Sequence, residues 1–298
     1  MTVTLFDLIR DVASHVGALV EGVATGGSTT TIIDTVVRTE PDDYWNGGDA
    51  LIIYDAGGAG AAPQGEIKRI TDFVSSTSTI TAGTFTAAVA ASDRYAIMRR
   101  AYGENVRWSD VITQKINQAL LALGPIETVD TTTITIATDQ TEYELPLAAK
   151  QDLRKVWLQV DNTDANDNRW IEFNDWYIET KGAGSKSLLV LNRQLATNYK
   201  LKLVYLADHA RLNAYTDKLN EIVPVQRVLY PATRDTFLWM KQVTGKTIWD
   251  EDIRRWEELA EAAAVRYRMN VPKKRAHFWK PEITDIVRLE SEPNIVRL

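Results

Sequence analysis

From the sequence we expect the fold of this chain to be organised around residues 249–267, which read WDEDIRRWEELAEAAAVRY. Apolar side chains recur there at alternating spacings of four and three, at Trp249, Ile253, Trp256, Ala260, Ala263 and Tyr267. This spacing predicts a helix with one apolar face. Acidic residues crowd its first turn and arginines its last, as the helix dipole favours. We interpret the apolar seam as core packing and not as a cofactor site, because aromatic stripes at helical spacing usually lie inside proteins.

Three more helices are predicted from the same kind of pattern. A run that opens near Pro224 and ends before Gly245 pairs with the seam helix as a hairpin. Residues 4–19 form an amphipathic helix whose start carries Thr4 and Asp7 in capping-box positions. Residues 109–123 form another, stopped by Gly124 and Pro125.

Two regions of short β-prone runs separate these helices. In the first, the runs are 32–37, 51–54, 65–73, 78–82 and 94–98. In the second, they are 131–137, 141–145, 155–160, 170–173, 176–180, 188–191 and 199–205. Along the last run apolar residues alternate with Lys200 and Lys202, which predicts one buried and one partly solvated face. Short, regularly spaced strands of this kind favour small barrels or sandwiches.

The expected fold class is therefore α+β: a helical bundle with two β-sandwich or barrel-like lobes inserted and an extended C-terminal arm. The bundle would combine the N-terminal helix, the middle helix and the C-terminal helical hairpin. The predicted segments are 1–22 for the first helix, 23–100 for the first β lobe, 101–126 for the middle helix, 127–206 for the second β lobe, 207–271 for the hairpin and 272–298 for the arm.

Composition narrows the class of protein. The 298 residues contain 34 basic and 40 acidic side chains, a net charge of -6 that argues against a protein coating duplex nucleic acid, although it leaves room for a local basic patch. The sequence has no cysteine, which excludes disulfides and thiolate chemistry. No secretion signal or apolar run long enough for a membrane span is recognisable, so we expect a product folded in the cytosol.

Each candidate motif for catalysis or metal binding lacks a residue that its chemistry requires. Residues 60–65 have the frame of a phosphate-binding loop, but Glu66 and Ile67 follow where lysine and serine or threonine are required. Residues 164–168 resemble the start of a calcium loop, but Arg169 replaces the glycine that its sharp turn needs. The three histidines, His15, His209 and His277, share no ligand spacing, and we interpret them as packing or capping residues. We therefore expect no enzyme, no metal and no cofactor.

The C-terminal arm, 272–298, is the candidate partner-binding segment. It lacks helical or strand periodicity, yet it is too apolar for a free tail. Its candidate contact residues are Lys273, Lys274, Arg275, Phe278 and Trp279. The two rings would insert into a neighbour's pocket, and the basic trio would meet an acidic rim or the DNA backbone. The competing interpretation is an arm folded back on its own chain.

The order of segments resembles the head-to-tail adaptor (neck, connector) proteins of tailed bacteriophages. The resemblance is carried by the Leu5–Arg10 helix, the β stretch from Trp45 through 65–70 to 93–95, the strand end 142–146 and the passage from Tyr199 to Tyr267. It covers most of the chain, and its motifs are degenerate.

This resemblance implies a viral structural protein in the neck of the virion, made in the host cytoplasm and located between head and tail. It implies a homo-oligomeric ring, commonly of about twelve subunits, with helices near the DNA channel and non-specific proximity to packaged DNA. The implied partners are further copies of the chain, the portal protein and tail or other neck proteins, with no membrane.

Two other classes of function remain open at this stage. The chain is alternatively a tail-fibre or baseplate attachment protein whose β lobes bind a cell-surface glycan, which its nine tryptophans and eleven tyrosines allow. A trimeric fibre would show longer β repeats, and none is visible. A hydrolase of cell-wall polymer is the third and least favoured class.

Overall fold

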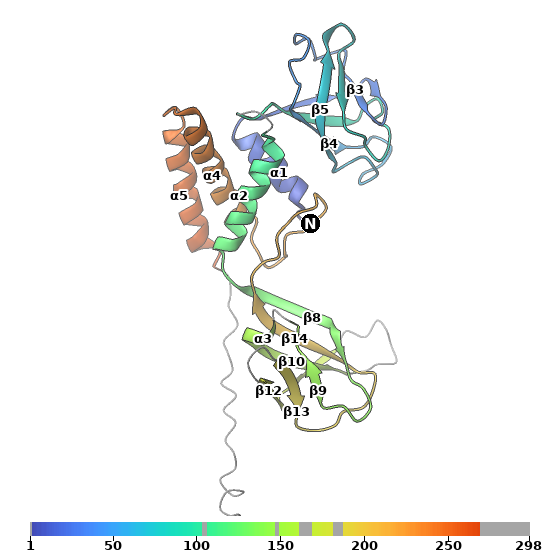
Figure 1. Ribbon diagram of the computed structural model, residues 1–298, viewed down its shortest axis with the longest axis vertical. Helices are drawn as coiled ribbons and strands as arrows, with labels where there is room; N and C mark the ends of the chain where they lie inside the picture. Colours follow the sequence, from blue (N-terminus) through green and yellow to red (C-terminus); the bar gives the residue numbers. More distant parts are fainter. Residues whose placement is uncertain (1, 103–105, 147–148, 161–168, 181–186, 269–298) are drawn as a thin grey trace, which may run out of the picture. The chain divides into compact units, whose positions relative to one another are not determined.

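The structure is a computed structural model that describes residues 2–102, 106–146, 149–160, 169–180 and 187–268 (Figure 1). The described chain divides into two compact units. Unit 1 combines the described parts of Met1–Ile126 and Asp208–Asn270, and unit 2 is the described part of Glu127–Ala207. Unit 2 thus interrupts unit 1 in the sequence.

Seven strands of unit 1 form one antiparallel sheet in the order β1-β7-β4-β5-β6-β3-β2. Their bounds are β1 (Leu19–Val23), β2 (Gly26–Gly27), β3 (Thr31–Ile33), β4 (Asp49–Tyr54), β5 (Ile67–Val74), β6 (Thr79–Ala82) and β7 (Arg94–Met98). A single 3-10 turn, η1 (Ser75–Thr77), links β5 to β6. The loop 60–65 lies between the paired strands β4 and β5, so it is part of a hairpin connection.

The central strands of this sheet are covered on both faces. In β4 the first four residues are all buried, and side chains of successive residues point to opposite faces. Ala50 and Ile52 belong to a core with Trp45, Phe73 and Tyr95, inside the curled sheet. Leu51 belongs instead to the core that the helices share. Such continuous apolar strands are typical of strands buried on two sides.

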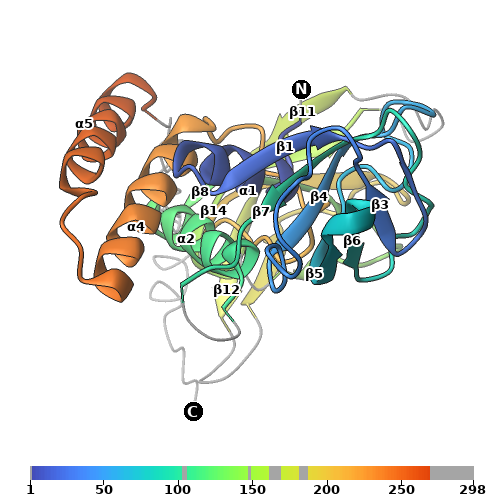
Figure 2. The same cartoon turned by 90° about the horizontal axis from the view of Figure 1, so that it is seen from above.

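Four helices longer than a single turn lie in unit 1. They are α1 (Leu5–His15), α2 (Trp108–Ala122), α4 (Gln226–Thr244) and α5 (Asp250–Arg266). Figure 2 shows α5 beside α4, in agreement with the contacts between these two helices. At the start of α1 the predicted capping box is confirmed: Thr4 N donates to Asp7 Oδ2 (3.0 Å) and Asp7 N donates to Thr4 Oγ1 (3.3 Å).

Helix α1 ends earlier than predicted, at His15. Gly17 follows with a φ of 68°, a left-handed conformation that glycine adopts without steric cost and that commonly ends helices. Residues 19–23, which the sequence analysis placed in or after the helix, form strand β1 and pair with β7. The other predicted helices and most predicted strands are found within a few residues of their expected bounds.

Unit 2 is built from two antiparallel sheets. The four-stranded sheet has the order β11 (Trp170–Phe173), β10 (Leu153–Gln159), β14 (Lys200–Ala207) and β8 (Ile126–Thr135). The three-stranded sheet has the order β12 (Trp176–Thr180), β13 (Ser187–Leu191) and β9 (Glu142–Glu144), and the short helix α3 (Ala149–Asp152) precedes β10. Both sheets contribute to one core, with Val156 and Leu203 from the first and Trp176 and Leu189 from the second.

The predicted fold class, an α+β helical bundle with two inserted β lobes and an arm, is wrong. The described chain is mostly β, with fourteen strands in three antiparallel sheets and only four helices longer than one turn. The physical reason is the shared core of unit 1. Leu51, Ile67, Ala96 and Met98 of the sheet pack into the same cluster as the helices, so the helices cover a sheet face and form no separate core. The six-segment division remains a prediction, and the arm lies outside the described residues.

Candidate functional site

The predicted partner-binding residues cannot be placed. Lys273, Lys274, Arg275, Phe278 and Trp279 all lie outside the described residues, which end at 268. The calcium-like turn at 164–168 lies outside them as well. The surfaces of unit 1 and unit 2 that are described therefore provide the candidates.

The seam of α5 faces the rest of unit 1, but it is less buried than predicted. Trp249, Ile253 and Trp256 are partly buried and pack against the shared core. Ala263 is the one residue of α5 that is fully buried. Because most of its surface remains accessible, α5 is the outermost helix of the group and not a central core element.

Aromatic contacts attach α5 to its neighbours. The Trp256 ring lies edge-on to His15 of α1, with centroids 4.7 Å apart, and 5.6 Å from Tyr230 of α4. A second group joins Tyr102 to Trp249 at 6.3 Å, and Trp108 to Trp239 at 5.4 Å. Each such pair contributes about 0.5–1.5 kcal/mol beyond its buried area, so these ring contacts help to hold the hairpin on the rest of unit 1.

Four apolar side chains of the helical hairpin, on α4, on α5 and in the turn between them, are left exposed by the described residues. We call Leu238, Val243, Ile248 and Val265 the hairpin surface. Val243 is 47% exposed and Ile248 is 69% exposed, and the turn between the helices lies between them. Lys241 Nζ and Asp250 Oδ1, 2.6 Å apart, bridge the same turn. The exposed Val243 and Ile248 beside this ion pair make the turn the candidate contact region of the hairpin.

A buried polar network crosses the core of the first sheet. Arg38 is 1% exposed, and its Nε donates to Tyr95 Oη (2.8 Å), which in turn donates to Asp34 Oδ2 (2.7 Å). The Arg38 guanidinium also lies 5.4 Å from the Trp45 ring. Burial, together with the hydrogen bond to Asp34, raises the pKa of Tyr95 above its ordinary range, so the phenol stays protonated. Arg38 Nη2 also donates to the Glu21 carbonyl (3.0 Å), so the network joins the segment of Asp34 and Arg38 to β1 and β7.

A second buried carboxylate joins the sheet to α2. Asp49 of β4 is 1% exposed and accepts from Arg107 Nε (2.7 Å) and from Ser109 Oγ (2.8 Å). Burial by itself lowers the pKa of the Arg107 guanidinium. The charge of Asp49 and its hydrogen bond have the larger combined effect, so the pKa of Arg107 is raised. Arg107 and Ser109 begin α2, so this ion pair fixes the position of the helix on the sheet.

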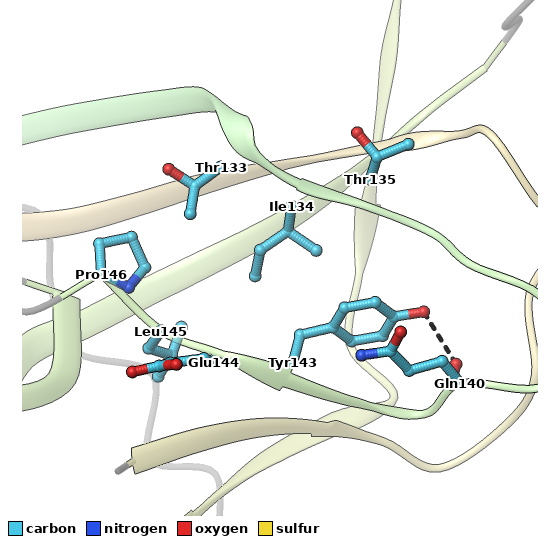
Figure 3. A pocket seen from close by; sticks show the side chains of 8 residues that line it. All are labelled: Thr133, Ile134, Thr135, Gln140, Tyr143, Glu144, Leu145 and Pro146. Carbon is cyan, nitrogen blue, oxygen red and sulfur yellow. Dashed lines mark hydrogen bonds between the residues drawn. The ribbon is translucent and has the colours of Figure 1, made fainter.

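One open hollow of about 560 Å³ lies in unit 2, between β8 and the region of β9 (Figure 3). Its lining residues are Thr133, Ile134, Thr135, Gln140, Tyr143, Glu144, Leu145 and Pro146. The Tyr143 hydroxyl donates to the Gln140 carbonyl at 2.8 Å, the bond drawn in Figure 3, and Thr133 Oγ1 donates to Asp130. Glu144 is the single carboxylate in this lining.

Histidine has structural roles where it is described. His15 packs on Trp256, and His209 closes a turn. The amide of Asn220 donates to His209 Nε2 at 3.0 Å, so that nitrogen accepts, and Nδ1, 2.6 Å from the Ala210 carbonyl, carries the proton. The packing and capping roles predicted for these two residues are confirmed, and His277 lies outside the described chain. Over the described residues, no three His, Asp or Glu side chains group as metal ligands would.

Comparison with known proteins adds no relative: no protein-family model matches the chain, and no curated protein matches it either. None of the helices in the described part of the chain combines the length and apolar character needed to cross a membrane.

Proposed function

We propose that this chain is a structural virion protein of a tailed bacteriophage, whose copies form a ring that connects the portal of the head to the tail and borders the DNA channel. The protein acts by assembly and not by catalysis, and it needs no metal. Its partners are other copies of itself, the portal protein, and tail or further neck proteins. The resemblance in segment order supports the proposal, and so does the structural use made of the buried ionisable groups in the networks of Asp34 and Asp49.

The observation that carries the proposal is the hairpin surface. Helix α5 buries only Ala263 fully; Val265 in this helix and Ile248 in the turn before it are 66% and 69% exposed. The occupant we assign to it is a second copy of the chain. The first turn of α5 is acidic, at Asp250, Glu251 and Asp252, and its last turn holds Arg266, so a head-to-tail neighbour finds opposite charges at the two ends. Head-to-tail contacts close into a ring when the rotation between neighbours divides a full turn, and they form a filament otherwise.

The test is the oligomeric state of the purified full-length protein, by light scattering and negative-stain imaging, alone and with portal protein. We expect rings, and we expect Ile248→Asp and Val243→Asp to abolish them. The matched control is Val36→Asp, which places the same charge at a site that is 75% exposed in the turn after β3 of unit 1. A wild-type protein that stays monomeric with and without portal would overturn the proposal, and elongated trimers would favour the fibre or baseplate protein.

The arm 272–298 has its own test within this proposal. We propose that Phe278 and Trp279 anchor it in a neighbouring subunit or in the portal, with Lys273, Lys274 and Arg275 at the rim. Deletion of residues 272–298 should leave a folded protein that no longer joins heads to tails. Outright unfolding would assign the arm to its own chain, and normal infectious particles would refute docking.

A further inference from the structure

The outer face of the four-stranded sheet in unit 2 carries tryptophan and lysine side chains. Val156 of β10 and Leu203 of β14 are paired and belong to the core. Because side chains alternate along a strand, Trp157 and Lys202, which are paired with each other, point the other way. Members of this outer face are Lys155, Trp157, Trp170, Lys200 and Lys202, which we call the Trp-Lys face.

The lysine ammonium groups lie close to the indole rings. Lys202 Nζ is 5.8 Å from the centre of the Trp157 ring and 5.9 Å from that of Trp170, so one cation lies within cation–π range of two rings. Lys155 Nζ approaches Trp157 from the neighbouring position, at 5.9 Å. Both rings are partly accessible, and Lys200 is exposed beside them. Accessible indoles that share a lysine form a surface where flat aromatic groups and negative charge are recognised together.

We propose that the Trp-Lys face binds single-stranded nucleic acid. Indole rings stack on unpaired bases whatever their sequence, and lysines pair with the phosphates between them. An open antiparallel sheet that presents aromatic side chains is a known platform for such strands. Among the described residues that we assign to this face and Glu172, which is paired with Trp157 across the strands, three lysines stand against one carboxylate. A duplex fits less well for two reasons. Its bases are already stacked on one another, and its high charge density requires a broader basic surface than this acidic chain provides.

This inference is independent of the ring proposed above, because it concerns unit 2 and a different surface. Either proposal can fail without the other. Variants of the hairpin surface test ring assembly, whereas variants of Trp157 and the lysines test the binding of single-stranded nucleic acid. The nucleic acid recognised is also different in kind from the packaged duplex that a neck ring would surround.

The test uses the full-length protein and a fluorescein-labelled oligothymidylate of about 15 nucleotides, followed by anisotropy at several salt concentrations. We expect binding whose log-log salt slope is about -2, since each phosphate contact in a single strand contributes about -0.7. Trp157→Ala should weaken binding by about 5- to 150-fold, the loss of one stacked base, whereas Trp157→Phe should retain most of it. Lys202→Gln should weaken binding and reduce the slope by about 0.7.

The matched control is Lys115→Gln, which removes the same charge from α2, where Lys115 Nζ donates to Gln118 at 3.2 Å on an exposed surface of unit 1. Circular dichroism establishes that each variant is folded. The inference is overturned if wild-type protein does not bind the oligonucleotide at low salt, or if Lys115→Gln weakens binding as much as Lys202→Gln. It is equally overturned if a duplex or heparin binds as tightly with no effect of Trp157→Ala, since the face would then attract polyanions only through charge.

Discussion

Replacing Gly22 by alanine should destabilise the first sheet through a clash that the structure locates. A Cβ at Gly22 would lie 2.6 Å from both Cζ and Oη of Tyr95 and 2.8 Å from Asp34 Oδ2. Neither neighbour can move into solvent, because both are 0% exposed and hydrogen-bonded to each other. Overpacking of this kind costs about 1–3 kcal/mol, and a broken buried hydrogen bond costs about another 1–3 kcal/mol.

Gly26→Ala is the matched control for this change. No heavy atom lies within 4 Å of a Cβ built there, and both substitutions remove the same freedom from the unfolded chain, worth about 0.4–1 kcal/mol. The difference between the two variants therefore isolates the clash. We expect Gly22→Ala to be less stable than Gly26→Ala by about 3 kcal/mol, which lowers the urea midpoint by about 1 M or more.

The assay is urea unfolding combined with hydrogen exchange. Because the chain has two compact units, a single unfolding curve need not be two-state, and exchange in peptides that cover β1 and β7 assigns the loss to the first sheet. Equal midpoints for the two variants, with unchanged exchange in β1 and β7, would refute the reasoning.

Three further outcomes follow from the same structure. Arg107→Ala leaves Asp49 buried with only Ser109 as a hydrogen-bonding partner and should cost about 3 kcal/mol, part of which Asp49→Asn should restore in the double variant, as urea unfolding can measure. Trp256→Ala removes two ring contacts at a half-buried site and should cost about 2 kcal/mol, less than a central core deletion, with faster exchange in α5; unchanged unfolding would show that the ring does not hold the hairpin. Burial opposes the charge of Asp130, but hydrogen bonds from Thr133 and Thr132 outweigh it and lower its pKa. Its stabilising effect is thus present above its ordinary pKa and lost as pH falls through the lowered one, so Asp130→Asn should flatten the fall in stability of unit 2 between about pH 5 and pH 2; an unchanged pH profile would contradict this.

Local patterns in the sequence predicted the elements well. The alternation of Leu201 and Leu203 with Lys200 and Lys202 predicted the two faces of β14, and the structure confirms it at these positions. The capping box at Thr4 predicted where α1 begins, because capping depends on residues three positions apart. Strand β1 was missed, since five residues with a glycine among them give too short an alternation to recognise.

Long-range features were beyond reach of the sequence. The hydrogen bonds that join Arg38 and Asp34 to Tyr95 span 57 and 61 positions, so no spacing signals them. The Trp-Lys face was missed for the same reason: Trp157, Trp170 and Lys202 meet only through strand pairing. The sequence predicted a separate helical bundle because helical periodicity is easy to recognise. It gave no sign that sheet residues such as Leu51 and Met98 pack against these helices.

The discontinuous course of unit 1 has a consequence for synthesis on the ribosome. The first backbone amides of α1 are bonded by a distant segment: Leu5 N donates to the Asp217 carbonyl (2.8 Å) and Phe6 N to the Tyr215 carbonyl (3.0 Å). At translation rates of about 5–20 residues per second, roughly 10–40 s separate the emergence of these partners. During that interval the apolar face of α1 lacks its final cover, while the whole of unit 2 leaves the exit tunnel. The nascent chain should therefore complete its second unit before its first. A ribosome stalled at the point where residue 207 has left the exit tunnel and Tyr215 has not should carry a folded unit 2 and a protease-sensitive α1.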